Sequence, residues 1–271
     1  MENIDKAIGI RNQIIKEVGF NEKGMIYWGN NDFDIGAFPN SIFALLQATL
    51  GEEKKARNIR DAIKREIGFN HGGLVNIMVN HPEIDEDEMP RRGVYPTGPT
   101  PSANAAFGLL ELGLGERDKA TIIRDTMKKE FPFNSHGEIG GHVSEYDDMN
   151  YCRIPSINYS TSSTNLFRLL DCALEGDSNE KNKPIQELPD REDCCQYLLP
   201  KLFDRFLGNE VTEEEILRTI KEGKVKIRDG LIFEYCYDSY YNCSRHIAST
   251  ITNSVFALLY VTDKFKERLN G

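Results

Sequence analysis

An internal repeat constrains the fold of this chain more than any other feature of its sequence. When Gly51 is aligned with Gly115, 64 positions further on, the surrounding residues match without a gap. Self-similarity of this kind is typical of proteins that stack one supersecondary unit against the next. The matching pairs run from Phe43 with Phe107, through Ile59-Arg60-Asp61 with Ile123-Arg124-Asp125, to Gly73 with Gly137.

Each unit is predicted to contain two helices. The first (residues 41–50) is apolar and rich in small residues, and Gly51 follows it, as glycine often follows a helix C-terminus. The second is amphipathic, because Ile59 and Ile63 fall on one helical face while charged residues fall outside it. A tail (residues 68–74) and a long polar loop then lead to the next unit.

The two ends of the chain carry complementary half-units. The chain starts with a second-type helix and its tail, and it ends with a first-type helix in which residues 253–259 nearly copy residues 40–46. A further copy begins at Thr164. A polar insert (residues 176–189) delays its second helix (residues 191–207), and a short extra helix is expected at residues 212–221.

These half-units predict one all-α domain (residues 1–271), a closed α/α toroid of about four helical hairpins. An open array would expose two apolar ends, whereas here the N-terminal outer helix (residues 4–18) can pair with the C-terminal inner helix (residues 247–261). Arg60-Asp61 and Arg124-Asp125 recur on the outer helices and are therefore predicted to form structural ion pairs or caps. The inner helices should bury their equivalent apolar residues: Phe43, Leu46, Phe107, Leu110, Phe167, Leu170, Phe256 and Leu259.

The charge balance argues against two classes of partner. Lys and Arg number 33 against 43 Asp and Glu, which gives a net charge of −10. An acidic chain repels phosphate backbones and anionic lipid surfaces, so we expect neither nucleic acid nor membrane as a partner. No apolar run approaches the ~20 residues that span a bilayer, and the N-terminus lacks a signal-peptide pattern. We therefore expect a cytoplasmic protein whose six scattered cysteines are free thiols.

The unit resembles the repeat of the α/α-toroid superfamily, and no single family in it matches closely. The residues that carry the resemblance are Gly72-Gly73-Leu74, His136-Gly137 and Asp229-Gly230-Leu231. They stand where terpenoid cyclases and protein prenyltransferases have the tail of an outer helix, and six-hairpin glycosidases, lyases and epimerases share the architecture. The acidic motifs of the cyclases are absent, and the spacing of Asp238, Cys243 and His246 is not that of the prenyltransferase zinc site.

Long loops that gather at one mouth of a toroid are the expected place for function. Four such loops hold all five histidines and the only Trp, together with many carboxylates and Tyr rings. This composition favours a polar, hydroxyl-rich ligand over a cationic isoprenoid. The predicted substrate-binding residues are Trp28, His71, Tyr95, His142, Tyr151, Asp229, Glu234, Tyr235 and His246.

The predicted acid/base residues are the carboxylates of the same loops. Glu138 lies between two histidines, and it follows a shared glycine after which the other units place Met25, Leu74 or Leu231. A carboxylate there could act as a general acid or base, although Gly140-Gly141 could equally be a simple turn that leaves Glu138 facing water. The other candidates are Asp32, Asp34, Asp147 and Asp148, which could equally be solvated.

Three functions remain open from the sequence alone. The first is an enzyme that acts on a carbohydrate-like substrate by acid/base catalysis, as a hydrolase, lyase or epimerase. The second is an isoprenoid-handling enzyme, and the third is a non-catalytic toroid that binds a peptide or protein partner. The spacing of His136, Glu138 and His142 matches no zinc motif, so neither a metal nor a cofactor is expected. The oligomeric state is left open.

Overall fold

The computed structural model describes residues 2–30, 35–70, 72–76, 98–147, 152–176, 184–185, 195–222, 225–238 and 243–270. In the two β-hairpins, residues 142–147, 152–156, 158, 235–238 and 243–246 are described by their backbone alone.

Most of the described chain is helical, as the repeat predicts. The helices are α1 (Glu2–Glu17), α2 (Ala37–Thr49), α3 (Glu53–Ala62) with its π-helical continuation (Ile63–Ile67), α4 (Pro101–Gly113), α5 (Arg117–Glu130), α6 (Thr161–Glu175), α7 (Cys195–Phe206), α8 (Glu213–Glu222), α9 (Thr250–Tyr260) and α10 (Thr262–Asn270).

Two segments that the sequence analysis assigned to loops form strands instead. β1 (Gly140–Asp147) pairs with β2 (Cys152–Tyr159), and β4 (Leu231–Asp238) pairs with β3 (Lys226–Arg228) and β5 (Cys243–Ile247), all antiparallel. Their β-branched and aromatic residues fit a two-stranded ribbon.

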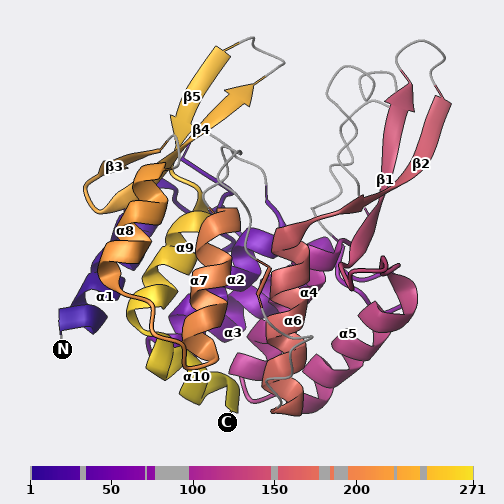
Figure 1. The fold of residues 1–271 in the computed structure, drawn as a ribbon, viewed down its shortest axis with the longest axis horizontal. Coiled ribbons are helices and arrows are strands. Elements are labelled where there is room, and N and C mark those ends of the chain that lie inside the picture. Colours follow the sequence, from indigo (N-terminus) through magenta and orange to yellow (C-terminus); the bar gives the residue numbers. More distant parts are fainter. Residues whose placement is uncertain are drawn as a thin grey trace.

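The helices pack in a consistent order. α2 contacts α4, α4 contacts α6, α6 contacts α7, α7 contacts α9, and α9 contacts α2 (Figure 1). α3, α5 and α8 pack on α2, α4 and α7, and α1 packs on α9, as the complementary chain ends predict. The helix expected as the outer partner of the third copy, α7, lies between α6 and α9 instead.

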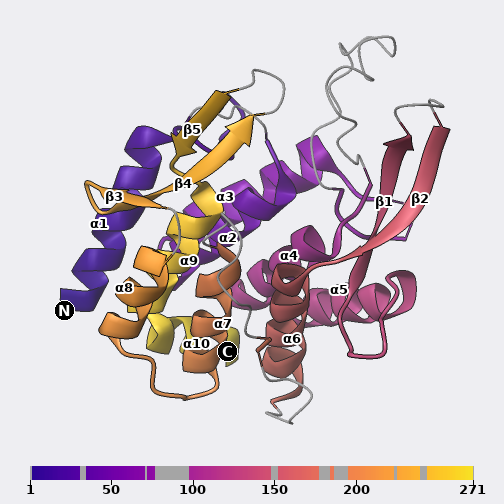
Figure 2. The same cartoon turned by 45° about the horizontal axis from the view of Figure 1, so that its top comes forward.

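The two hairpins and the C-terminal helix lie at opposite ends of the molecule. β1–β2 and β4–β5 project from one end, whereas α10 lies at the other, in both views (Figures 1 and 2). α10 contacts α2, α4, α6, α7 and α9, with Phe265 and Leu269 fully buried. The end that carries the hairpins is called the hairpin side below.

The core confirms the predicted inner-helix positions. All eight apolar residues that the repeat placed inside are at most 5% exposed. Three tail phenylalanines also pack edge-to-face on the inner-helix phenylalanines, which favours the same geometry in each unit. The ring-centroid distances are 5.8 Å for Phe20 and Phe43, 5.9 Å for Phe69 and Phe107, and 5.4 Å for Phe133 and Phe167.

A buried amide fastens each of three tails to the next inner helix. The Asn253 Oδ1 atom accepts a hydrogen bond from the Ile232 N–H at 2.7 Å, and its Nδ2 donates to the Ile232 carbonyl at 2.9 Å. Asn40 binds Ile26 and Asn104 binds Val75 in the same way. All three amides are 0% exposed, so each supplies partners that the buried strand residue could not obtain from water.

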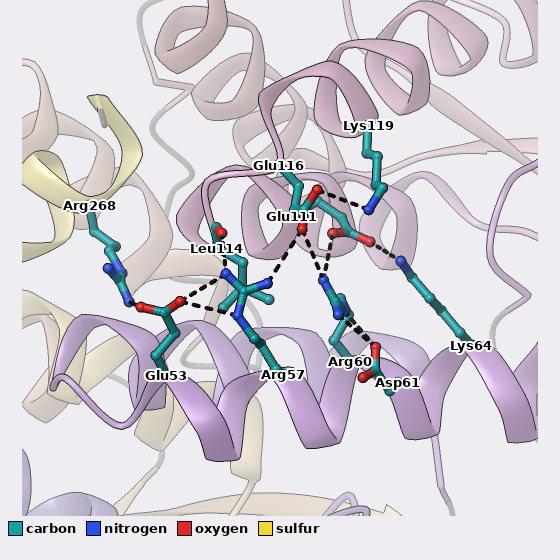
Figure 3. Close-up of polar contacts among 10 residues, drawn as sticks. All are labelled: Glu53, Arg57, Arg60, Asp61, Lys64, Glu111, Leu114, Glu116, Lys119 and Arg268. Atoms are coloured by element: carbon teal, nitrogen blue, oxygen red, sulfur yellow. Dashed lines mark hydrogen bonds and ion pairs between the residues drawn. The ribbon is translucent and has the colours of Figure 1, made fainter.

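Arginines of the outer helices form a second repeated contact. Arg60 of α3 pairs with Asp61 at 2.8 Å and with Glu111 of α4 at 3.5 Å (Figure 3). Arg124 of α5 likewise pairs with Asp125 at 2.7 Å and with Asp171 of α6 at 3.1 Å. Glu111 is 1% exposed and also pairs with Lys64. The predicted structural role of the two Arg-Asp pairs is confirmed.

Candidate functional site

The hairpin side is where the units differ from one another. In the unit that leads to α9, the second residue after the amide-bound Ile232 is Glu234. The residue equivalent to Glu234 is Trp28 before α2 and Gly141 before α6. A position that holds a carboxylate, an indole and a glycine in three copies has no common packing role.

Glu234 is a buried carboxylate on β4. It is 8% exposed, and its Oε1 atom accepts a hydrogen bond from the Thr252 hydroxyl at 2.6 Å. Thr252 lies in the first turn of α9 and is itself fully buried. A carboxylate is rarely buried without partners, and the strand and the helix hold this one at the hairpin side of the molecule.

Trp28 lies beside the start of the same helix. Its carbonyl accepts a hydrogen bond from the Thr250 N–H at 2.9 Å, and Gly29 forms a β-bridge with Ser249. The indole packs against Gly36, the N-cap of α2: a Cβ atom at Gly36 would lie 2.9 Å from Cζ3 of the ring. The indole is half-buried, so part of it remains open to a ligand.

Glu138 makes mainly local contacts among the described residues. The side chain of Asn134 donates to Glu138 Oε2 at 2.5 Å and accepts from the Glu138 N–H at 3.0 Å. Burial lowers the pKa of the Arg168 guanidinium, and the nearby charge of Glu138 partly offsets this effect. Arg168 also donates to the His136 carbonyl at 3.3 Å. These contacts stabilise the turn between α5 and β1.

Arg168 is a site feature that sequence reasoning missed. It stands on α6 where α2, α4 and α9 have Ala44, Gly108 and Ala257. A Cβ atom at Gly108 would lie 2.6 Å from Leu170 of the inner helix α6 and 3.5 Å from Ile123 of the outer helix α5, so this position lies between a neighbouring inner helix and the outer helix. The third unit thus departs from the repeat twice, at Glu138 and at Arg168. The departures were visible in the sequence but were not connected.

The strand registers place the other candidates of β1–β2 on faces of the hairpin. Asp147 pairs with Cys152 and shares a face with Gly141, and a Cβ atom at Gly141 would touch Pro101 at the start of α4. His142 pairs with Ile157 on the opposite face, which also carries Tyr159. Asp147 and His142 therefore occupy opposite faces of one ribbon.

The same reasoning applies to β4–β5. Tyr235 and His246 are directly opposite each other in register, and both lie on the face opposite to Glu234. Asp229 lies in the turn before β4 with a φ of 52°, and its side chain is 71% exposed.

The predicted convergence of Glu138 with another carboxylate stays a prediction. Six predicted residues lie outside the described residues: Asp32, Asp34, His71, Tyr95, Asp148 and Tyr151.

Among the described residues, no group of three or more His, Cys, Asp or Glu side chains could hold a metal ion. Within the same residues, no helix combines the length and the apolar character needed to cross a bilayer.

Comparisons with known proteins bear on the fold. No family model matches the sequence, and no curated protein matches it. The structure is similar to a family 76 glycoside hydrolase from a bovine Bacteroides thetaiotaomicron strain, with 13% identity and a TM-score of 0.50. That match covers 98% of this chain and 78% of the hydrolase, and it shows a shared fold.

A second solved structure is less similar. It is a family 105 glycoside hydrolase from C. acetobutylicum ATCC 824, with 12% identity and a TM-score of 0.37. The match covers 96% of this chain and 72% of that chain.

Proposed function

We propose that this protein is an enzyme that acts on a carbohydrate by acid/base catalysis at the hairpin side of a closed α/α toroid. The cycle of contacts from α2 through α4, α6, α7 and α9 back to α2 supports the closed ring, with five inner helices. The shared fold with a solved glycoside hydrolase supports the substrate class. Because one fold hosts many chemistries, the proposal depends on the residues of the site.

The observation that carries the proposal is the buried carboxylate of Glu234. One Glu234 oxygen accepts from Thr252 at 2.6 Å, so the carboxylate is held in one orientation by a rigid inner helix. An oriented carboxylate can accept a proton from a sugar hydroxyl or water, or stabilise positive charge at the reacting carbon. Glu234 was predicted as a substrate-binding residue, and its burial now makes it the favoured acid/base residue.

Acid/base chemistry on a sugar needs a second group. The candidates for this role are the predicted carboxylates Asp32, Asp34, Asp147 and Asp148. A carboxylate separation of about 5–5.5 Å would fit a retaining hydrolase, and about 6.5–9.5 Å an inverting one. Lyase and epimerase chemistry would use the same two groups on a substrate with an acidic C–H.

The test is a screen of purified protein against polysaccharides and oligosaccharides of different linkage and charge. New reducing ends report hydrolysis, absorbance from a new double bond reports elimination, and sugar analysis reports epimerisation. On any substrate that is turned over, Glu234→Gln should lower kcat by about 10²–10⁴-fold. Because Gln keeps an oxygen that can accept from Thr252, the variant should fold.

Glu138→Gln is the matched control, because it makes the same chemical change on the equivalent tail of another unit. It should retain kcat within about threefold, since the described contacts of Glu138 are with its own turn and Arg168. Full activity of Glu234→Gln, with loss of activity in Glu138→Gln, would assign the chemistry to the other glutamate. Absence of turnover on every carbohydrate tested would refute the proposed function.

A further inference from the structure

The tail that precedes α6 forms a small sheet with the hairpin β1–β2. Phe133 and Ile139 form an antiparallel bridge, and the Gly140 N–H donates to the Pro132 carbonyl at 2.9 Å. Gly140 also pairs with Tyr159 of β2. Three extended segments therefore lie side by side, and alternate residues of each segment point to opposite faces of the sheet.

The two faces of this sheet have different surroundings. On the inner face, Phe133 packs on Phe167 of α6, and Ile139 is 0% exposed. On the outer face, the side chain of Asn134 donates to Glu138 at 2.5 Å. By the same alternation, the outer face also carries Pro132, Gly140, Ile157 and Tyr159.

Two apolar side chains of β2 extend across Gly140 on the outer face. A Cβ atom at Gly140 would lie 2.5 Å from Cγ2 of Ile157 and 2.9 Å from Cε1 of Tyr159, so the close approach requires a glycine. Each side chain covers Gly140 with one side only, because Ile157 is 46% and Tyr159 is 37% exposed. Their exposed sides form an apolar surface, called the platform below.

In other units, the end of an outer helix reaches the equivalent tail. Lys23 of the first tail pairs with Glu66, near the end of the π-helical continuation of α3, at 2.6 Å. Arg228, just before the fourth tail, pairs with Glu17 at the end of α1 at 3.9 Å, and α1 contacts β4. The residues equivalent to Glu138 in these tails and in the second one are all 0% exposed: Met25, Leu74 and Leu231.

The third tail lacks such a cover among the described helices. The outer helices α1, α3, α5 and α8 pack mainly on α9, α2, α4 and α7, so α6 is the one inner helix without an outer helix of its own in the described part of the chain. The tail residue here is the half-buried Glu138 instead of a buried Met or Leu. The outer face of this sheet is therefore open, with a polar border beside the platform.

We propose that the platform is a surface site that binds a glycan chain. This inference rests on the proposed function, because it takes the ligand to be the carbohydrate on which the enzyme acts. The C–H face of a pyranose can pack on the exposed sides of Tyr159 and Ile157, while its hydroxyls stay hydrated at the polar border. A protein helix is the less suitable occupant, because the tails that a helix end reaches present Met or Leu where this tail presents Glu138.

The platform is separate from the inner helices. It lies on the face of β1–β2 opposite to Gly141, where a Cβ atom would touch Pro101 at the start of α4. A polysaccharide held at the platform keeps its other units at a high effective concentration near the proposed acid/base residue, Glu234. The contribution of the platform should therefore increase with the length of the substrate.

The experiment compares a polysaccharide that the activity screen identifies with its own short oligosaccharides, using the full chain. Tyr159→Ala should lower the preference for the polysaccharide, measured as the ratio of the two kcat/KM values, by about fivefold or more. Tyr159→Phe keeps the ring and should keep the preference. Ile157→Ser changes an exposed side chain, so it should fold and should lower the preference in the same direction.

Two further measurements control for surface changes and for turnover. Ile122→Ala removes an apolar side chain that is 65% exposed on α5, away from the platform, and should change the preference by less than about twofold. Affinity electrophoresis in gels that contain the polysaccharide measures binding directly. Glu234→Gln should be retarded in such gels, and the addition of Tyr159→Ala should reduce the retardation.

The outcomes distinguish the platform from the proposed function. If a polysaccharide is turned over and both Tyr159→Ala and Ile157→Ser keep the wild-type preference, the platform is refuted and the proposed function stands. If a polysaccharide binds only when Tyr159 is present but no carbohydrate is turned over, the platform stands and the catalytic proposal fails. If no carbohydrate binds or reacts, both are refuted. A dimer in light scattering that Tyr159→Ala converts to a monomer would assign the platform to a second copy of the chain and overturn the glycan site.

Discussion

Glu234 and Glu138 lie on equivalent tails of different units, but their surroundings differ. Glu138 is hydrogen-bonded to Asn134 of its own turn and lies near Arg168 of α6. Glu234 is 8% exposed and is held by Thr252 from an inner helix. A break in a repeat is therefore a weak sign of function by itself, because a neighbouring break can compensate for it structurally.

The largest expected effect is a loss of stability when an ion pair between an outer and an inner helix is broken. Arg60→Ala removes one cation from the buried Glu111, which is 1% exposed. Loss of a partner from a buried charge lowers the free energy of unfolding by about 3–5 kcal/mol. Because Lys64 still pairs with Glu111, the loss should lie near the lower end of that range. Urea denaturation measures the change. If Arg60→Ala also lowered carbohydrate turnover per folded molecule, the view that this ion pair affects only stability would be contradicted.

A second prediction compares two buried asparagines that bind a tail residue in the same way. Asn253→Ala and Asn104→Ala each remove a buried amide that binds both backbone groups of a tail residue. Each should lower the free energy of unfolding by about 1–3 kcal/mol, because backbone groups lose their partners. Only Asn253→Ala should also lower kcat, since Glu234 lies two residues after Ile232. Equal kcat in the two variants would argue that β4 does not position the chemistry.

A third prediction concerns the bond that orients Glu234. Thr252→Val keeps the side-chain shape but removes the hydroxyl that donates to Glu234. A hydrogen bond to a charged group contributes about 1.5–3 kcal/mol, so part of this should appear as lower stability and part as about a tenfold loss of kcat. An unchanged kcat in Thr252→Val would indicate that this hydrogen bond does not position the chemistry.

A fourth prediction concerns Glu138. Glu138→Gln keeps an oxygen that can accept from Asn134 and removes only the charge near Arg168. Half-exposed ion pairs contribute about 0–1 kcal/mol, so the stability change should fall in that range. A loss above about 2 kcal/mol, measured by denaturation, would show that Glu138 has a larger structural role than its described contacts indicate.

The smallest effect is a pH dependence of the outer wall. Hydrogen bonds from Arg57 and then Arg268 lower the pKa of Glu53 below 4.5. Glu53 therefore contributes stability that is present above pH 4.5 and is lost as pH falls through its lower folded-state pKa. Thermal unfolding between pH 6 and 3 should show a smaller decrease in Glu53→Gln than in the wild type. Identical curves would contradict the contribution of this ion pair between α3 and α10.

The sequence predicted the helical part of the fold because its signal recurs. Phe43 and Phe107 share a register, and so do Arg60 and Arg124, so each unit supports the interpretation of the others. The position of α7 was not predicted, because its sequence does not match the pattern that the other inner helices share. The hairpins were not predicted, because their segments are rich in charge and tyrosine and show no regular alternation of apolar and polar residues.

The candidate site was harder to predict because it depends on burial. Glu234 and Asp229 are both acidic residues near the same turn, yet one is buried and the other is exposed. No local pattern separates them, because the difference arises from packing of β4 on α9.

A crystal structure of Glu234→Gln bound to an oligosaccharide that the wild type turns over would test the location of the site most directly. The expected result is a sugar at the hairpin side, with a hydroxyl or the reacting bond within hydrogen-bonding distance of residue 234. A sugar bound instead beside Glu138 and Arg168, with residue 234 free of contact, would contradict the assignment of the chemistry to Glu234.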